Sequence, residues 1–209
     1  VNFEGGNAAA SIPGNATAKV IVPKDKTEAF DTLVTQCDEA LEAEYGETDA
    51  CIQVDSVPSV WHGAVVSEEG THLLLACING IPVGPTELLD DQLTPMTSNN
   101  IGVVTMQSAK DKSTAMNTFI ISTHTRSFDD QKMEHLADQI KKIFEVSGAE
   151  VELVMNAPGW KEDESNELVE LTCKTFNDVL GFEPKKVNMH FVLEAGYLVN
   201  NFPGLHISS

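Results

Sequence analysis

Basic residues are scarce in this 209-residue chain, where 13 Lys and Arg stand against 32 Asp and Glu and the formal net charge is −19. Nucleic-acid phosphates are bound mainly by Lys and Arg, so the deficit argues against a nucleic-acid partner. It argues equally against an anionic membrane surface. The excess acid can attract cations or metal ions, or it can form an ordinary solvated surface, which is the simpler interpretation.

Long apolar runs and paired cysteines are also missing. No run approaches the ~20 residues that a membrane-spanning helix needs. The four cysteines form no CxxC pair and are irregularly spaced: Cys37, Cys51, Cys77 and Cys173. This spacing favours buried free thiols in a reducing compartment over disulfides or a zinc site, so we expect a cytoplasmic protein. No HExxH, phosphate-loop, GxSxG or dinucleotide-binding motif occurs either.

The remaining composition is that of a globular protein, with 42% hydrophobic and 22% charged residues. Hydrophobic periodicity predicts two strand–helix–strand units along the chain. Their expected elements are a strand at Ala16–Val22, a helix at Thr27–Tyr45 and a strand at Cys51–Val57, then a strand at Asn117–Thr125, a helix at Asp130–Val146 and a strand at Ala149–Met155.

The apolar stripes of the two helices match at one fixed offset. They comprise Phe30, Leu33, Val34, Cys37 and Leu41 in the first helix, and Met133, Leu136, Ala137, Ile140 and Phe144 in the second. Each stripe predicts one buried helix face, and Gly46 and Gly148 are suited to a left-handed helix end. The match indicates an internal duplication, although any two amphipathic helices can share such a stripe.

Further elements complete an α+β architecture of antiparallel sheets with helices on one face, in which duplicated ββαβ pieces form a ferredoxin-like arrangement. We expect a helix at Glu68–Ile78 and a strand at Ile101–Met106 before the second unit. Pro158-Gly159 marks a domain boundary. Beyond it we expect a partial α/β segment: a helix at Ser165–Leu180 capped by Asp163 or Ser165, a strand at Val187–Val192, a helix at Ala195–Asn201, and a strand beginning at Leu205–Ser208.

Two sets of polar residues are candidates for chemistry. Arg126 ends the predicted strand 117–125, on the same face as His124, and could grip a carboxylate with two parallel hydrogen bonds. From composition alone, an ordinary surface arginine is the simpler interpretation. His190 and Glu194 are spaced i, i+4, which would place both on one helix face as metal ligands or an acid–base pair. Because a strand is predicted at 187–192, the alternative is a strand-end histidine and a glutamate that caps a helix.

Several short motifs occur in an order that resembles one enzyme family. They are Gly5-Gly6-Asn7 with Ile12-Pro13, Asn79-Gly80, Gly102-Val103-Val104-Thr105, Arg126-Ser127, Pro158-Gly159-Trp160, and His190 to Gly196. Together they are similar to the bacterial aminoacyl-histidine (Xaa-His) dipeptidases, which are dinuclear zinc metallopeptidases. The metal-binding motifs of that family lie before and after this segment, so the resemblance implies a middle piece of a longer enzyme.

The resemblance implies residues 1–157 as most of a lid and dimerisation domain and residues 158–209 as a partial catalytic-domain segment. It implies a small peptide substrate, a homodimer formed through the lid, and two zinc ions in the parent enzyme. No metal ligand or catalytic residue is expected in this chain, which alone should be inactive. Substrate-binding roles are implied for Arg126, His190, Glu194 and Gly196.

The chain departs from the family pattern at two positions. Ala10 stands where the family has Asn, whose amide is thought to reach the substrate, and Val192 stands where it has Gly. These departures support an alternative function, a catalytically inert relative that acts as a binding or assembly module.

Overall fold

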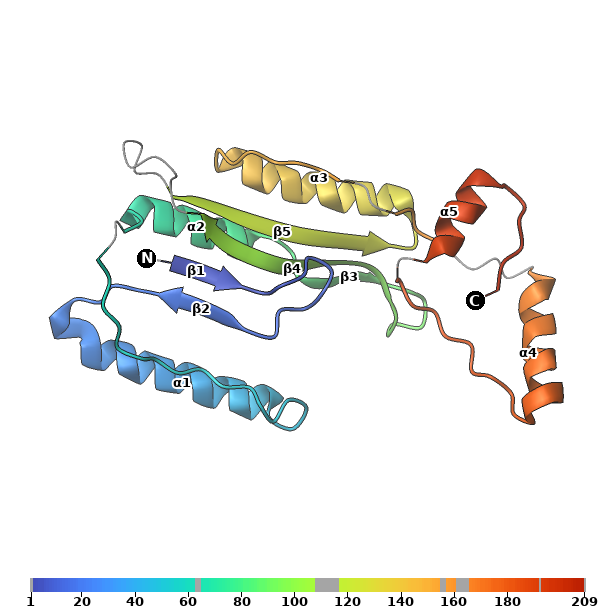
Figure 1. The fold of residues 1–209 in the computed structure, drawn as a ribbon, viewed down its shortest axis with the longest axis horizontal. Coiled ribbons are helices and arrows are strands. Elements are labelled where there is room, and N and C mark those ends of the chain that lie inside the picture. The colour runs from blue at the N-terminus through green and yellow to red at the C-terminus, as the bar shows by residue number, and fades with distance from the viewer. Residues whose placement is uncertain are drawn as a thin grey trace.

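An antiparallel ribbon of two long strands, β4 (Pro95–Gln107) and β5 (Thr118–Ser127), forms the centre of the computed structural model (Figure 1). The structure describes residues 2–62, 65–107, 117–154, 157–160, 166–191 and 193–208. β3 (Gly84–Leu88) pairs with the first part of β4, and β1 (Asn2–Gly5) meets β4 at Val104. β2 (Ala16–Lys19) pairs with β1. All these pairings are antiparallel, which confirms the predicted α+β class.

The hydrophobic core lies between the ribbon and α3 (Asp130–Val146), which α2 (Glu68–Gly80) contacts. It comprises the buried Ile81, Leu136 and Ile140, with Ile101 and Phe144 packed against them. The predicted apolar stripe of α3 is therefore confirmed at its central residues. Burial of each such side chain contributes about 1.5–3 kcal/mol, so this cluster fixes α3 against β5.

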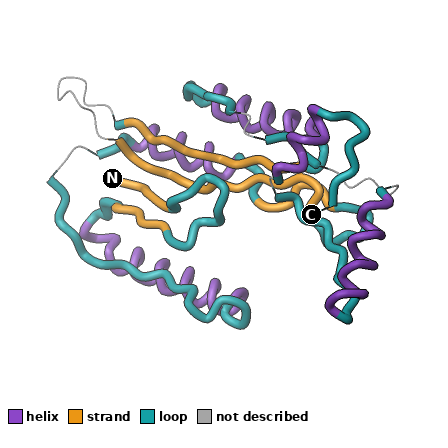
Figure 2. Tube along the Cα trace, turned by 45° about the vertical axis from the view of Figure 1, so that its right-hand side comes forward, coloured by secondary structure: helices purple, strands orange, loops and turns teal. Residues whose placement is uncertain are grey.

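The first long helix, α1 (Thr27–Tyr45), has the predicted bounds and follows a short 3-10 turn, η1 (Lys24–Lys26). Its predicted burial is wrong, because no residue of α1 is buried and Leu33 is 56% exposed. Figures 1 and 2 show α1 beyond β2, with the following segment returning along it. That segment is tied to the helix by the Val54 backbone N–H, which donates to Asp38 Oδ1 at 2.6 Å.

Four predicted strands do not form in the described residues. Residues 51–57, 149–154, 187–191 and 205–208 are irregular, and Met155 and Val192 lie outside the described part of the chain. A strand needs a neighbour whose backbone groups complete its hydrogen bonds. None of the described strands pairs with these segments, so apolar composition alone misidentified them.

Two helices lie beyond one end of the sheet, α4 (Glu167–Leu180) and α5 (Glu194–Asn201) (Figure 1). Asn166 caps α4, its Oδ1 accepting the Leu168 N–H at 3.0 Å. The predicted caps, Asp163 and Ser165, lie outside the described residues.

Glycine conformations at the helix ends agree with the predictions in part. Gly148 is left-handed, with φ +80°, as expected after α3. Gly46 is not, because its φ of −58° continues the right-handed turn of α1.

All four cysteines are free, as expected, but only Cys77 is buried. Cys173 is half-buried, and Cys37 and Cys51 are exposed. The expectation of buried thiols is therefore wrong for the two cysteines of α1 and its following segment, for the same reason that the α1 stripe is not buried.

Candidate functional site

One face of the β4–β5 ribbon carries four polar side chains. The register pairs Ser98 with Arg126 and Asn100 with His124. Alternate residues of a strand point to the same side of a sheet, so all four share a face, opposite the face that α3 covers. We call Ser98, Asn100, His124 and Arg126 the polar face. The predicted placement of His124 and Arg126 on one face is confirmed.

Arg126 is half-buried and held on two sides. Its Nη2 donates a hydrogen bond to the Ala10 carbonyl oxygen at 2.8 Å. Its guanidinium carbon lies 6.0 Å from the centroid of the Phe191 ring, within the range of a cation–π contact. The side chain therefore joins the end of β5 to two segments that are distant in sequence.

His190 is brought to the polar face from the irregular segment before α5. Its Nε2 lies 2.7 Å from Ser98 Oγ, in a hydrogen bond whose direction depends on the imidazole tautomer. The ring also lies against Phe128, with centroids 6.2 Å apart and planes inclined by 42°. Two of the predicted site residues, Arg126 and His190, thus lie in one neighbourhood, 64 positions apart in the chain.

Electrostatics at the polar face favour neutral imidazoles beside one fixed cation. Burial lowers the pKa of His190, and the positive charge of Arg126 lowers it further. Burial also lowers the pKa of His124, and the positive charge of Arg126 lowers it further. Since Arg stays protonated at any physiological pH, the site presents a guanidinium with neutral hydrogen-bonding rings around it, which is suited to an anion such as a carboxylate.

The Pro158-Gly159 segment packs tightly against the end of β5. A Cβ on Gly159 would lie 2.6 Å from the Ser127 carbonyl oxygen and 2.7 Å from that of Phe128. The Gly159 N–H donates to Asp130 Oδ1 at 2.6 Å, next to the start of α3. Only glycine allows this approach without a shift of the backbone.

Gly196 completes this contact from α5. It is buried, and a Cβ there would lie 2.9 Å from the Pro158 carbonyl oxygen. The end of β5, the Pro158-Gly159 segment and the first turn of α5 therefore meet at one end of the sheet, and Gly196 has a packing role there.

Glu194 is the first residue of α5, and Leu193 is the N-cap. His190 precedes the helix in irregular structure. The i, i+4 spacing therefore does not place these two residues on one helix face, and the metal-ligand interpretation of that spacing has no support.

A tight turn formed by Ala8–Ser11, which we call the 8–11 loop, lies across β4. The Ser11 N–H donates to the Ala8 carbonyl oxygen at 3.1 Å and closes the turn. Asn100 Nδ2 donates to the Ser11 carbonyl oxygen at 2.7 Å and lies 3.4 Å from that of Ala9. Ala10, one of the two departures from the family pattern, is therefore in contact with Arg126 through its backbone; Val192, the other departure, lies outside the described residues.

Sequence reasoning did not identify Ser98 and Asn100. Both precede the predicted strand start at Ile101, whereas β4 begins at Pro95. No alternation of apolar and polar residues marked this part of the strand, because residues 97–100 are all polar.

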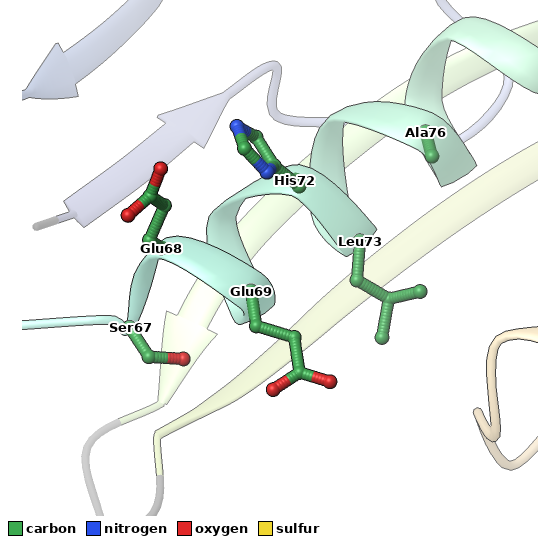
Figure 3. A pocket seen from close by; sticks show the side chains of 6 residues that line it. All are labelled: Ser67, Glu68, Glu69, His72, Leu73 and Ala76. Carbon is green, nitrogen blue, oxygen red and sulfur yellow. The ribbon is translucent and has the colours of Figure 1, made fainter.

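Two surface depressions in the described part of the chain lie away from the polar face. Figure 3 shows one on α2, lined by Ser67, Glu68, Glu69, His72, Leu73 and Ala76. Glu68 and His72 point to one side of the helix there, and Glu69 and Leu73 point to the other. A second depression, between β3 and α3, contains the ion pair of Lys132 with Glu87. Neither includes a residue of the polar face.

Within the described ranges, no group of three or more His, Cys, Asp or Glu side chains is placed to hold a metal ion. These residues therefore do not fit a dinuclear zinc centre. None of the described helices is both long and apolar enough to cross a membrane.

Two known proteins to which this chain is similar are dipeptidases. No protein-family model matches the chain. It is 26% identical over 212 residues to the cytosol non-specific dipeptidase of Escherichia coli (strain K12), and the alignment covers 100% of this chain and 42% of that protein. The resemblance to dipeptidases that was predicted from the motifs is therefore confirmed as homology to part of such a protein.

A solved structure shows the same fold. The aminoacylhistidine dipeptidase of Vibrio alginolyticus superposes with a TM-score of 0.84 at 23% identity, covering 99% of this chain and 41% of that one. The chain thus spans less than half the length of both proteins that it matches.

Proposed function

We propose that this chain is the substrate-binding lid segment of a zinc-dependent dipeptidase that hydrolyses Xaa-His-type dipeptides. The observation that carries the proposal is the meeting of Arg126 and His190 on the polar face. Homology to a cytosol non-specific dipeptidase supports a peptidase-related function and a cytosolic location.

Arg126, on the polar face, would bind the carboxylate of the dipeptide. A guanidinium has five N–H donors in a planar fork, and the Ala10 carbonyl oxygen accepts from Nη2. The remaining donors can form the paired hydrogen bonds that make Arg–carboxylate contacts strong. His190, held by Ser98 and kept neutral by its surroundings, is placed to offer a further hydrogen bond to the substrate.

In this proposal, residues 1–157 form most of the lid and dimerisation domain, and residues 158–209 belong to the catalytic domain. The tight contact of Gly159 with the end of β5 would join the two. Because the described residues do not fit a metal centre, the two zinc ions of the parent enzyme would be held elsewhere. The part assigned to this chain is to bind and orient the substrate.

Homodimer formation through the lid is supported by apolar side chains that have no cover. Within residues 1–157, Leu33 on α1 is 56% exposed, and Val20 and Ile21 after β2 are 50% and 61% exposed. Exposed apolar side chains that lie together are typical of surfaces that bind another protein subunit. Sedimentation of the full-length protein should therefore show a dimer.

A second candidate is a catalytically inert relative that acts as a binding or assembly module. It is favoured by the contact between Arg126 and the Ala10 backbone, at a position where the resembling family carries an Asn side chain. In such a module, the 8–11 loop would take the place of a substrate at the guanidinium.

A zinc-loaded activity assay of the full-length protein separates the two. A panel of Xaa-His and other dipeptides is incubated with the protein, and the released amino acids are quantified by chromatography. We expect hydrolysis, fastest for Xaa-His substrates, and none by the 209-residue chain alone. Dipeptide binding by calorimetry without hydrolysis would favour the inert module, and absence of both would contradict both candidates.

A further inference from the structure

We propose that Asn100 is a positioning residue, which orients the Arg126 guanidinium by fixing the 8–11 loop. This inference rests on the proposed function of the polar face in binding a substrate carboxylate. Asn100 would not itself contact the substrate. It would act through the backbone carbonyl groups of Ala9, Ala10 and Ser11.

The contacts form a continuous path from Asn100 to Arg126. Asn100 Nδ2 donates to the Ser11 carbonyl oxygen at 2.7 Å and lies 3.4 Å from the Ala9 carbonyl oxygen. The carbonyl between them, that of Ala10, accepts from Arg126 Nη2 at 2.8 Å. One side-chain amide thus holds the loop on both sides of the single carbonyl group that holds the guanidinium.

β4 carries no side chain where the 8–11 loop packs on it, because Gly102 lies at that position. A Cβ on Gly102 would lie 2.2 Å from the Ala9 carbonyl oxygen and 2.5 Å from that of Ala8. Gly6 has a φ of +70°, and a Cβ there would lie 1.9 Å from the Gly102 carbonyl oxygen. Both positions therefore require glycine. The two glycines allow the 8–11 loop to pack closely on β4.

A guanidinium held in this way binds an anion with a smaller entropic cost. A long side chain that becomes immobile only on binding loses rotamer freedom at that step. The Ala10 carbonyl bond restricts Arg126 beforehand, and the Phe191 ring lies beside the guanidinium. Loss of Asn100 should free the loop and, through it, Arg126, without removing any group that contacts the substrate.

The test uses the full-length protein and two readouts. Hydrogen–deuterium exchange measures protection of peptides spanning residues 7–14. Steady-state kinetics measures KM and kcat for a dipeptide and for the same dipeptide with its carboxylate amidated. The variants are Asn100→Ala, Asn100→Ser, which retains one donor, and Gln107→Ala, an amide removed from the exposed end of the same strand as a control.

In Asn100→Ala we expect faster exchange in residues 7–14 and a KM about three- to tenfold higher for the free dipeptide, the size expected for ordering one long side chain. We expect kcat to change less than KM, the amidated dipeptide to be unaffected, and Asn100→Ser to restore KM in part. Adding Asn100→Ala to Arg126→Ala should have no further effect. Gln107→Ala should match the wild type.

Unchanged exchange in residues 7–14 would overturn the inference whatever the kinetics, because Asn100 would then not fix the loop. Equal losses for the free and amidated dipeptides would also overturn it, since the effect would not pass through carboxylate binding. Absence of hydrolysis and of dipeptide binding by the wild-type protein is a separate result: it removes the proposed function and, with it, this role of Asn100.

Discussion

Ser98 Oγ and His190 Nε2 lie 2.7 Å apart, although 92 positions separate the two residues in the chain. Ser98 belongs to β4, whereas His190 lies in the irregular segment that leads into α5. A hydrogen bond over this separation ties the two ends of the proposed site together. It also places an imidazole of lowered pKa beside Arg126, which makes the contact sensitive to pH.

We expect the stability contributed by this contact to decrease in acid. The folded-state pKa of His190 is lowered from 6.5 by burial and by Arg126, so the unfolded chain takes up the proton more readily than the folded one. The contribution is complete above about pH 6.5 and is lost as the pH falls below that value. The melting temperature should therefore drop more between about pH 7.5 and 5.5 in the wild type than in His190→Gln.

Circular dichroism melts of the full-length protein check this expectation. Exposed His62 provides the matched control, and His62→Gln should keep the wild-type pH dependence. Equal slopes for the wild type and His190→Gln would show that protonation of His190 is not linked to folding.

Gly159→Ala should destabilise the contact between the Pro158-Gly159 segment and β5. The new methyl group would lie within 2.8 Å of backbone atoms of Ser127 and Phe128, so the backbone must move. Overpacking of this kind typically costs about 1–3 kcal/mol in the free energy of unfolding.

Gly14→Ala is the control for this substitution, because a Cβ at Gly14 has no neighbour within 4 Å. Its effect should stay within about 0.5 kcal/mol in denaturant unfolding. Similar free energies of unfolding for the two variants would mean that the Pro158-Gly159 segment does not pack as closely as the structure shows.

Leu136→Ala and Leu33→Ala should have very different effects on stability. Leu136 is only 6% exposed in the core beneath α3, so its truncation should cost about 2–5 kcal/mol. Leu33 is 56% exposed on α1, and in the 209-residue chain alone its truncation should cost roughly 0.5 kcal/mol or less. Denaturant unfolding of both variants measures the difference. A large loss at Leu33 in the full-length protein would show that another surface covers α1.

Local patterns predicted the helices well. The bounds of α1 and α3 were predicted from apolar spacing and the glycines that follow, because those features depend on neighbouring residues alone. The burial of α1 could not be predicted in the same way. An amphipathic stripe indicates which face can be buried but not which surface covers it, and Leu33 and Leu136 carry the same signal with opposite outcomes.

Strand pairing and the site depend on distant residues, and here the sequence was less informative. The apolar segment 51–57 has strand-like composition, but none of the described strands pairs with it, whereas the polar start of β4 at residues 95–100 pairs with β3 and β5. Ser98 and Asn100 were therefore missed. Arg126 and His190 were predicted as two separate candidates from their local patterns, and only the motif resemblance indicated that they belong to one site.

The most direct test of the proposed function is the effect of Arg126→Ala on dipeptide hydrolysis by the full-length protein. Loss of a charge-assisted hydrogen bond to the substrate carboxylate should cost about 1.5–3 kcal/mol. That corresponds to a roughly tenfold to hundredfold lower kcat/KM. Arg126→Lys should restore only part of the loss, because an ammonium group lacks the planar fork.

The decisive comparison pairs each free dipeptide with its C-terminally amidated form, with melting temperatures recorded in parallel. We predict that Arg126→Ala abolishes the preference for the free carboxylate while the protein still melts near the wild-type temperature. An unchanged kcat/KM for the free dipeptide at unchanged melting temperature would contradict the account, because Arg126 would then be an ordinary surface charge.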